Sequence, residues 1–176
     1  MAKPKRIILY GEGKDDAIFL RHLWEIYQSD YPNIICKIYA GTGGSPAHIV
    51  QSLIKKHLSL ASYDAALALL DEDQGTKGIK PKNLKIHNIQ VILNRPICIE
   101  GLLLKTCQPT TQIGPGTTAQ KLKAQFKKEL LETDQGSGLS QLFKQKCPKL
   151  LTRKVLDQAQ SNSQTLTEIQ NWLSKF

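Results

Sequence analysis

The chain has 176 residues, of which 40% are hydrophobic and 22% are charged, a composition that excludes a disordered chain and suits one domain or one domain with an appended subdomain. The formal net charge is +9, and residues 101–176 carry 11 basic but only 5 acidic side chains, which permits a polyanion partner. No apolar run approaches the about 20 residues of a membrane span, and residues 7–10 are too short for a signal peptide, so we expect a cytoplasmic protein without membrane contact.

Apolar runs bounded by glycine, proline or polar residues alternate with segments of helical periodicity over residues 1–105. The runs predict strands, and the segments between them predict helices. In chain order they are a strand at 6–10, a helix at 15–28, a strand at 34–40, a helix at 45–57, a strand at 64–71, a loop at 74–87, a strand at 88–94 and a helix at 96–104. Ser45 is expected to cap the second helix, with Pro46 as its first residue.

This alternation predicts an α/β fold with a mostly parallel sheet of about four strands flanked by helices. The clearest break in the chain follows at residues 114–117. Beyond it the sequence shows only helical patterns, at 118–133, 137–146, 150–159 and 163–175. We therefore expect an α/β domain at residues 1–112 and a helical C-terminal extension, residues 113–176, packed on it.

The four cysteines have no spacing typical of a zinc site. They are Cys36, Cys98, Cys107 and Cys147. Cys36 and Cys98 lie in apolar runs and are expected to be small core residues. We expect neither structural zinc nor a disulfide framework.

Acidic residues follow two of the predicted strands. Glu12 stands between two glycines after the first strand, and Asp71 and Asp73 end the third. Residues two apart in extended chain point the same way, so Asp71 and Asp73 could converge on one cation while Glu72 turns away. Parallel strands share one carboxyl end, where ligands bind in such folds, so Glu12 is expected beside them. The alternative is two solvated acidic turns.

The same stretches resemble the Toprim fold, shared by topoisomerases, bacterial primases, overcoming-lysogenization-defect nucleases and recombination-repair proteins. Residues 7–23, with the run EGKDD at 12–16 between an apolar strand and a helix, look like its Glu-Gly-x-x-Asp motif. Residues 69–73 look like its Asp-x-Asp motif. Residues 93–104 are similar to an element of RloB-like members, in which Asn-x-Pro precedes a Glu and a leucine-rich helix.

The resemblance implies a site for Mg²⁺ or Mn²⁺. It gives Glu12 the role of a general acid/base or metal-linked acid, has Asp71 and Asp73 hold the cation, and offers Glu100 as an additional acid. Hard carboxylate oxygens suit these cations. The segment after residue 116 is not part of the resemblance.

Two further features suit contact with phosphates. The loop at 41–45 precedes a helix N-terminus, where backbone amides favour an anion, although a tight turn is an equal alternative. Basic helices after the break predict capture of a nucleic-acid backbone, with ordinary solvated lysines as the alternative. The candidate phosphate contacts are Lys14, Gly43, Gly44, Ser45, Lys123, Lys127 and Lys128.

Together these features predict divalent-metal-dependent phosphoryl transfer on nucleic acid, namely phosphodiester cleavage, with DNA favoured over RNA. The family analogy adds a setting in defence against foreign DNA. Two alternatives stay open: a non-catalytic Toprim module for nucleic-acid binding or assembly, and a nucleotide-binding enzyme that uses the loop at 41–45. A protein partner or a homodimer is also open.

Overall fold

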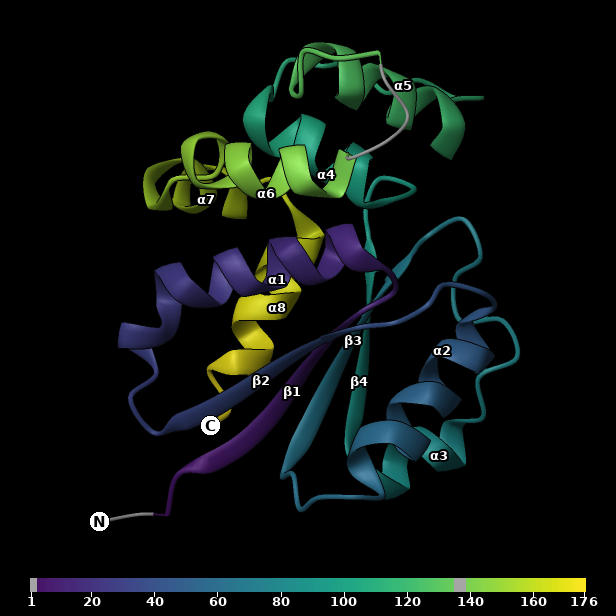
Figure 1. Ribbon diagram of the computed structural model, residues 1–176, viewed down its shortest axis with the longest axis vertical. Helices are drawn as coiled ribbons and strands as arrows, with labels where there is room; N and C mark the ends of the chain where they lie inside the picture. Colours follow the sequence, from purple (N-terminus) through teal and green to yellow (C-terminus); the bar gives the residue numbers. More distant parts are fainter. Residues whose placement is uncertain (1–2, 135–138) are drawn as a thin grey trace.

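The computed structural model describes residues 3–134 and 139–176 and contains a four-stranded sheet in the order β2-β1-β3-β4 (Figure 1). All three neighbouring strand pairs are parallel. The strands are β1 Lys5–Gly11, β2 Ile34–Ala40, β3 Ala65–Asp71 and β4 Ile89–Asn94. The predicted α/β fold with a parallel sheet is confirmed, with strand bounds close to those expected.

The two central strands are apolar on both faces because helices cover both sides of the sheet. β3 reads AALALLD and is buried along its length up to Asp71. β1 is buried from Ile7 to Gly11. β2 lies at the edge of the sheet, and Ile34 is its one buried residue. Because β1 and β3 are central and buried, the residues at and directly after their carboxyl ends are the first beyond the buried run that can reach solvent.

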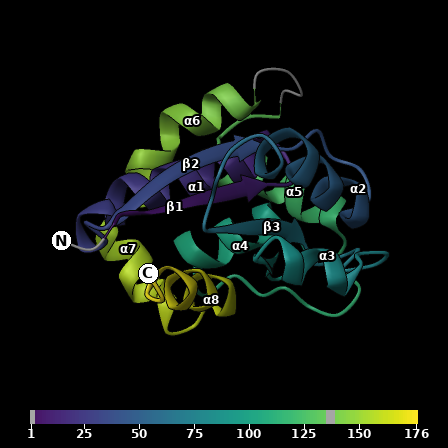
Figure 2. The same cartoon turned by 90° about the horizontal axis from the view of Figure 1, so that it is seen from below.

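Separate helices cover the two faces of the sheet (Figures 1 and 2). The helical elements of the first part are α1 Lys14–Tyr27, a 3₁₀ turn at Gln28–Asp30, α2 Pro46–Leu53, a π-helical turn at Ile54–Leu58 and α3 Pro81–Ile86. Ile7 and Leu9 belong to the core on the α1 side, whereas Ile8 and Tyr10 belong to the core under α2. Successive residues of β1 thus serve opposite faces.

Among the described residues, five further helices lie on the α1 side of the sheet. They are α4 Ile99–Cys107, α5 Ala119–Glu129, α6 Leu139–Leu150, α7 Arg153–Gln160 and α8 Gln164–Leu173. α6 packs on α1, α8 on β4, and both α5 and α7 on α4 (Figure 1). Phe126, Phe143 and Trp172 share one core with Leu20 and Leu23 of α1. Within the described residues, no helix is both long and apolar enough to cross a membrane.

Local structure departs from expectation in the segments 74–87 and 96–104, and part of a third expected element is not described. The expected loop at 74–87 contains α3, which starts with Pro81 after an extended Lys80. The expected helix at 96–104 begins only at Ile99, because Ile97 has a φ of 70° and cannot be part of a right-handed helix. Residues 137 and 138 of the helix expected at 137–146 lie outside the described residues.

Candidate functional site

Three neighbouring strands bring polar residues to the same end of the sheet. Glu12 follows β1, Asp71 ends β3 and Asn94 ends β4, and the register pairs Gly11 with Leu69 and Asp71 with Asn94. Oε2 of Glu12 accepts a hydrogen bond from the Asp71 backbone N–H at 3.0 Å. Glu12 and Asp71 are therefore neighbours, as the parallel arrangement of their strands led us to expect.

Asp16 is a buried acid of this group to which the sequence reasoning gave no role. It lies in the first turn of α1, where its Oδ2 accepts from the Gly13 N–H at 2.9 Å. α1 starts so close to β1 that a Cβ on Gly11 would lie 2.6 Å from Cβ of Asp16. Burial, and then the charge of Asp71, raise the pKa of Asp16 to about 8. This carboxyl is therefore mostly protonated at neutral pH.

Asn94 connects two of the acids. In the sequence it was visible only as the Asn of the Asn-x-Pro run and was given no role. Its fully buried Nδ2 donates to Oδ1 of Asp16 at 2.7 Å and to Oδ1 of Asp71 at 3.1 Å. The same Oδ1 of Asp71 accepts from the Ile99 N–H at 3.2 Å. Burial raises the pKa of Asp71, although these donors oppose the rise. Asn94 thus fixes the position of Asp71 relative to Asp16.

Glu100 and Lys123 approach the acids from two helices. Glu100, in the first turn of α4, is 8% exposed, and its buried Oε2 has no hydrogen-bond partner. Burial raises the pKa of Glu100. Burial alone would lower the pKa of Lys123, but Glu100 and then Asp71 outweigh it and raise the pKa. Lys123 of α5 therefore interacts electrostatically with Glu100 and Asp71.

The four acids and Lys123 line one cleft with a volume of about 320 Å³, whereas the buried Asn94 lies outside its lining. Its lining residues are Glu12, Gly13, Lys14, Asp15, Asp16, Gly43, Asp71, Ile99, Glu100, Lys123 and Ser140. Asp73 is exposed and does not line the cleft, although its charge raises the pKa of both Glu12 and Asp71 after the larger effect of burial. Lys127 and Lys128 do not line it either. The acids of the cleft come from three separate segments of the chain.

The glycine loop contributes one residue to the cleft. Gly43 lines it with a φ of 76°, a conformation that favours glycine. Gly44 and Ser45 lie outside the lining. Oγ of Ser45 accepts from the His48 N–H at 3.3 Å, so Ser45 caps α2 as expected. Of the three loop residues expected to contact phosphate, the cleft therefore includes Gly43.

The donor chemistry of the cleft fits a hard divalent cation such as Mg²⁺ or Mn²⁺. Burial raises the pKa of Glu12, Asp71 and Glu100, and a cation would offset the cost of ionising them side by side. The unpartnered Oε2 of Glu100 is a further candidate ligand. Over the described residues, no three His, Cys, Asp or Glu side chains stand close enough to hold a metal ion together, so binding would require the carboxylates to move closer.

The stability of the metal-free protein is expected to fall between about pH 4 and pH 8. Folding raises the pKa of Asp16 from 3.8 to about 8, so the folded state keeps a proton that the unfolded state releases. Stability is therefore greatest below the unfolded-state pKa and is lost as the pH rises through the folded-state pKa. At about 1.4 kcal/mol per pKa unit, the loss amounts to several kcal/mol.

Urea denaturation of the parent and of Asp16→Asn at pH 5 and pH 8 measures this effect. The variant should lose much less stability between the two pH values than the parent does. Asp134→Asn, at an exposed acid, serves as the control and should follow the parent. An equal loss in the parent and in Asp16→Asn would contradict the expectation.

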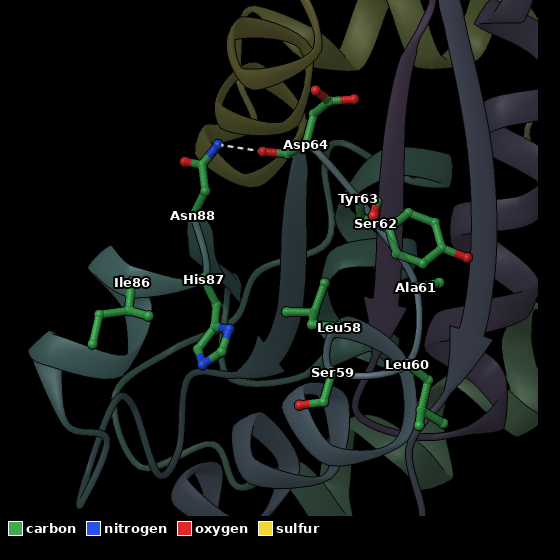
Figure 3. A pocket seen from close by; sticks show the side chains of 10 residues that line it. All are labelled: Leu58, Ser59, Leu60, Ala61, Ser62, Tyr63, Asp64, Ile86, His87 and Asn88. Carbon is green, nitrogen blue, oxygen red and sulfur yellow. Dashed lines mark hydrogen bonds between the residues drawn. The ribbon is translucent and has the colours of Figure 1, made fainter.

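A second hollow, of about 510 Å³, lies at the opposite end of the sheet (Figure 3). It is lined by residues 58–64, which precede β3, and residues 86–88, which precede β4. Asp64 is the one acid in this lining, and it forms an ion pair with Lys5 and accepts from the Arg6 N–H at 2.7 Å. This hollow therefore lacks the group of acids found in the cleft.

Comparisons with protein-family models, with curated proteins and with solved structures found no significant match. The four-stranded parallel α/β sheet is compatible with a Toprim-like fold. What the cleft can do is therefore argued from its own residues.

Proposed function

We propose that this protein cleaves phosphodiester bonds of nucleic acid with the help of a divalent cation, as a Toprim-like nuclease. The observation that carries the proposal is the convergence of Glu12, Asp71 and Glu100 on one cleft beside the buried Asp16. Acids whose pKa is raised by burial and by neighbouring charges are typical of sites that bind cations or move protons. Lys123 adds a positive group at the same cleft for a phosphate.

The roles follow from the position of each side chain. Asp71 and Glu100 would hold the cation, with the exposed Asp73 able to join them, and the bound cation supplies stabilisation of negative charge on the phosphate. Glu12 uses Oε2 to accept from the Asp71 N–H, which leaves its other oxygen to take or give a proton. Burial raises the pKa of Glu12, which is the direction that proton transfer by a carboxyl group requires. Asp16 would hold its proton and support the site.

The charge distribution supports nucleic acid as the substrate. Lys14 and Lys123 line the cleft, and Lys127 and Lys128 belong to the same helix as Lys123. Such contacts hold a phosphate backbone without reading its bases. A backbone bound along α5 would pass over the acids, and we favour DNA over RNA.

The direct test is incubation of the protein with plasmid DNA and with single-stranded DNA in Mg²⁺, Mn²⁺ or EDTA. The proposal predicts nicking or degradation that requires the metal. DNA binding that persists in EDTA without any cleavage would instead indicate a non-catalytic module. Thermal stabilisation by a nucleotide but not by DNA would indicate a nucleotide-binding enzyme.

DNA binding is expected to weaken steeply with salt, with a slope of about −0.9 per phosphate contacted on duplex DNA. Replacement of Lys123, Lys127 and Lys128 by Gln should flatten the slope of log affinity against log salt, because fewer counterions are then released. Fluorescence anisotropy at several salt concentrations in EDTA measures it.

The matched control replaces three lysines on the other face of the sheet. Lys55, Lys56 and Lys85 belong to the π-helical turn and to α3, so their change to Gln removes the same charge away from the cleft. This control should keep the parent slope. Equal slopes for both triple variants would mean that the lysines of α5 are ordinary solvated residues.

A further inference from the structure

Glu72 lies between the two acids of the Asp-x-Asp run and has different partners. Its Oε1 accepts from Nε of Arg95 at 3.0 Å, and its Oε2 accepts from the Ile97 N–H at 3.1 Å. Both carboxylate oxygens are thus bound to the segment that joins β4 to α4. Glu72 does not line the acidic cleft, as expected for a residue that turns away.

Arg95 continues the connection to the C-terminal helix. Its Nη1 donates to Oε1 of Glu168 at 3.2 Å, and its backbone N–H donates to Oγ1 of Thr165 at 3.0 Å. Thr165 is fully buried and donates in turn to the Leu93 carbonyl at 2.7 Å. One guanidinium therefore joins an acid that follows β3 to an acid on α8.

The segments that this triad joins hold the cleft residues. The Ile97 carbonyl accepts from the N–H groups of Glu72 at 2.8 Å and Asp73 at 3.2 Å, so the 95–97 segment and the 72–73 turn fix each other. The same segment connects Asn94, which donates to Asp71, with Ile99, whose N–H also donates to Asp71. A shift of residues 95–97 would move donors of Asp71 and the start of the helix that bears Glu100.

We propose that the Glu72–Arg95–Glu168 triad is a positioning device that holds the acids of the cleft in place from α8. The three side chains are between 30% and 39% exposed, so their ion pairs add little to global stability. Their effect is local, on the 71–73 turn and the 95–99 segment. A helix about 70 residues distant in sequence from Arg95 thereby supports the candidate site.

Arginine is required because its planar guanidinium presents Nε and Nη1 to two different carboxylates at once. A lysine carries the same charge on a single nitrogen and would lose one of the two partners. Arg95→Lys therefore keeps the positive charge at this position but removes the bridge between the two carboxylates. Glu168→Gln removes the charge of the acid on α8 and leaves Glu72 untouched.

The test uses Arg95→Lys and Glu168→Gln, with Arg153→Lys as the matched control. Arg153 also bridges two acids, Asp30 and Asp157, but far from the cleft. Amide hydrogen exchange of the metal-free proteins should be at least about tenfold faster at Glu72, Asp73 and Ile97 in both triad variants, and unchanged there in the control. The melting temperatures of all three should stay close to that of the parent.

The second readout is Mn²⁺ affinity by calorimetry. Loss of residues that orient metal ligands lowers metal affinity about 10–100-fold, so the triad variants should bind Mn²⁺ at least about tenfold more weakly than the control. Unchanged exchange at the three amides would overturn the positioning role whatever the metal result. Faster exchange with parent affinity would also overturn it, because the acids would then not depend on the triad.

This inference rests on the proposed function only for the Mn²⁺ readout. A parent protein that binds no Mn²⁺ and cleaves no DNA would refute the proposed function, and the exchange measurement would then decide the triad by itself. Parent binding and cleavage with unchanged exchange in Arg95→Lys would refute the triad and leave the proposed function intact.

Discussion

Glu12→Gln is expected to abolish metal-dependent cleavage while leaving DNA affinity nearly intact. General acid–base work by one positioned side chain contributes about 10²–10⁴-fold to a rate, and the amide of Gln cannot take up the proton. The amide oxygen can still accept from the Asp71 N–H, which the Glu12 carboxylate now does at 3.0 Å, so the fold of this turn should survive. Single-turnover cleavage and anisotropy in EDTA measure the two quantities.

The control for this variant is Glu25→Gln, which makes the same replacement of a carboxylate by an amide at an exposed glutamate of α1. It should cleave and bind as the parent does. Cleavage by Glu12→Gln within about tenfold of the parent would exclude Glu12 as the proton-transfer residue. Loss of DNA binding together with cleavage would point to a damaged cleft, which circular dichroism and the melting temperature would reveal.

Asp71→Asn is expected to remove most of the Mn²⁺ affinity of the protein. Asp71 lies at the centre of the acidic group, beside Glu12 and in contact with Asn94 and Ile99. An amide is a neutral and weaker ligand for a hard cation than a carboxylate, so binding should weaken by at least about tenfold in calorimetry. The amide oxygen can keep the contacts of Oδ1, so the fold should persist.

Removal of one charge from this group should also stabilise the metal-free protein, because burial and, after it, repulsion between the acids raise their pKa and make their ionised forms costly. The melting temperature of Asp71→Asn in EDTA at pH 8 should therefore equal or exceed that of the parent. Asp64→Asn, just before the other end of the same strand, is the matched control and should keep the parent affinity for Mn²⁺. Parent affinity in Asp71→Asn would refute its role as a metal ligand.

Local sequence patterns determined the sheet and the end of the sheet at which the acids gather. The apolar runs of β1 and β3, each followed by polar residues, marked strands buried on both faces. The alternation of strands and helices along the chain favoured parallel pairing. Parallel strands end together, so the neighbourhood of Glu12 and Asp71 followed from two short motifs. Alternation of side chains along extended chain predicted that Asp73 would join Asp71 while Glu72 turned away. However, β3 ends at Asp71, and the turn that follows leaves Asp73 exposed outside the cleft.

Short-range patterns did not reveal how the other acids are held. Asp16 was visible in the Glu-Gly-x-x-Asp run, but its burial depends on the close packing of α1 against β1 at Gly11. The sequence did not indicate which groups the side-chain amide of Asn94 would bind. The register of β4 against β3 places it beside Asp71, and it donates hydrogen bonds to Asp16 and Asp71. Likewise, the start of α4 at Ile99 depends on the positive φ of Ile97.

The tertiary structure alone decided which distant helices reach the site. Lys123 was one of three lysines of one helix predicted to contact phosphate, and the packing of α5 on α4 brings it, rather than Lys127 or Lys128, into the cleft beside Glu100. Glu168 meets Arg95 because α8 packs against β4. Helical periodicity specifies which face of a helix is apolar, but the element on which that face packs is settled by the shape and volume of the whole core.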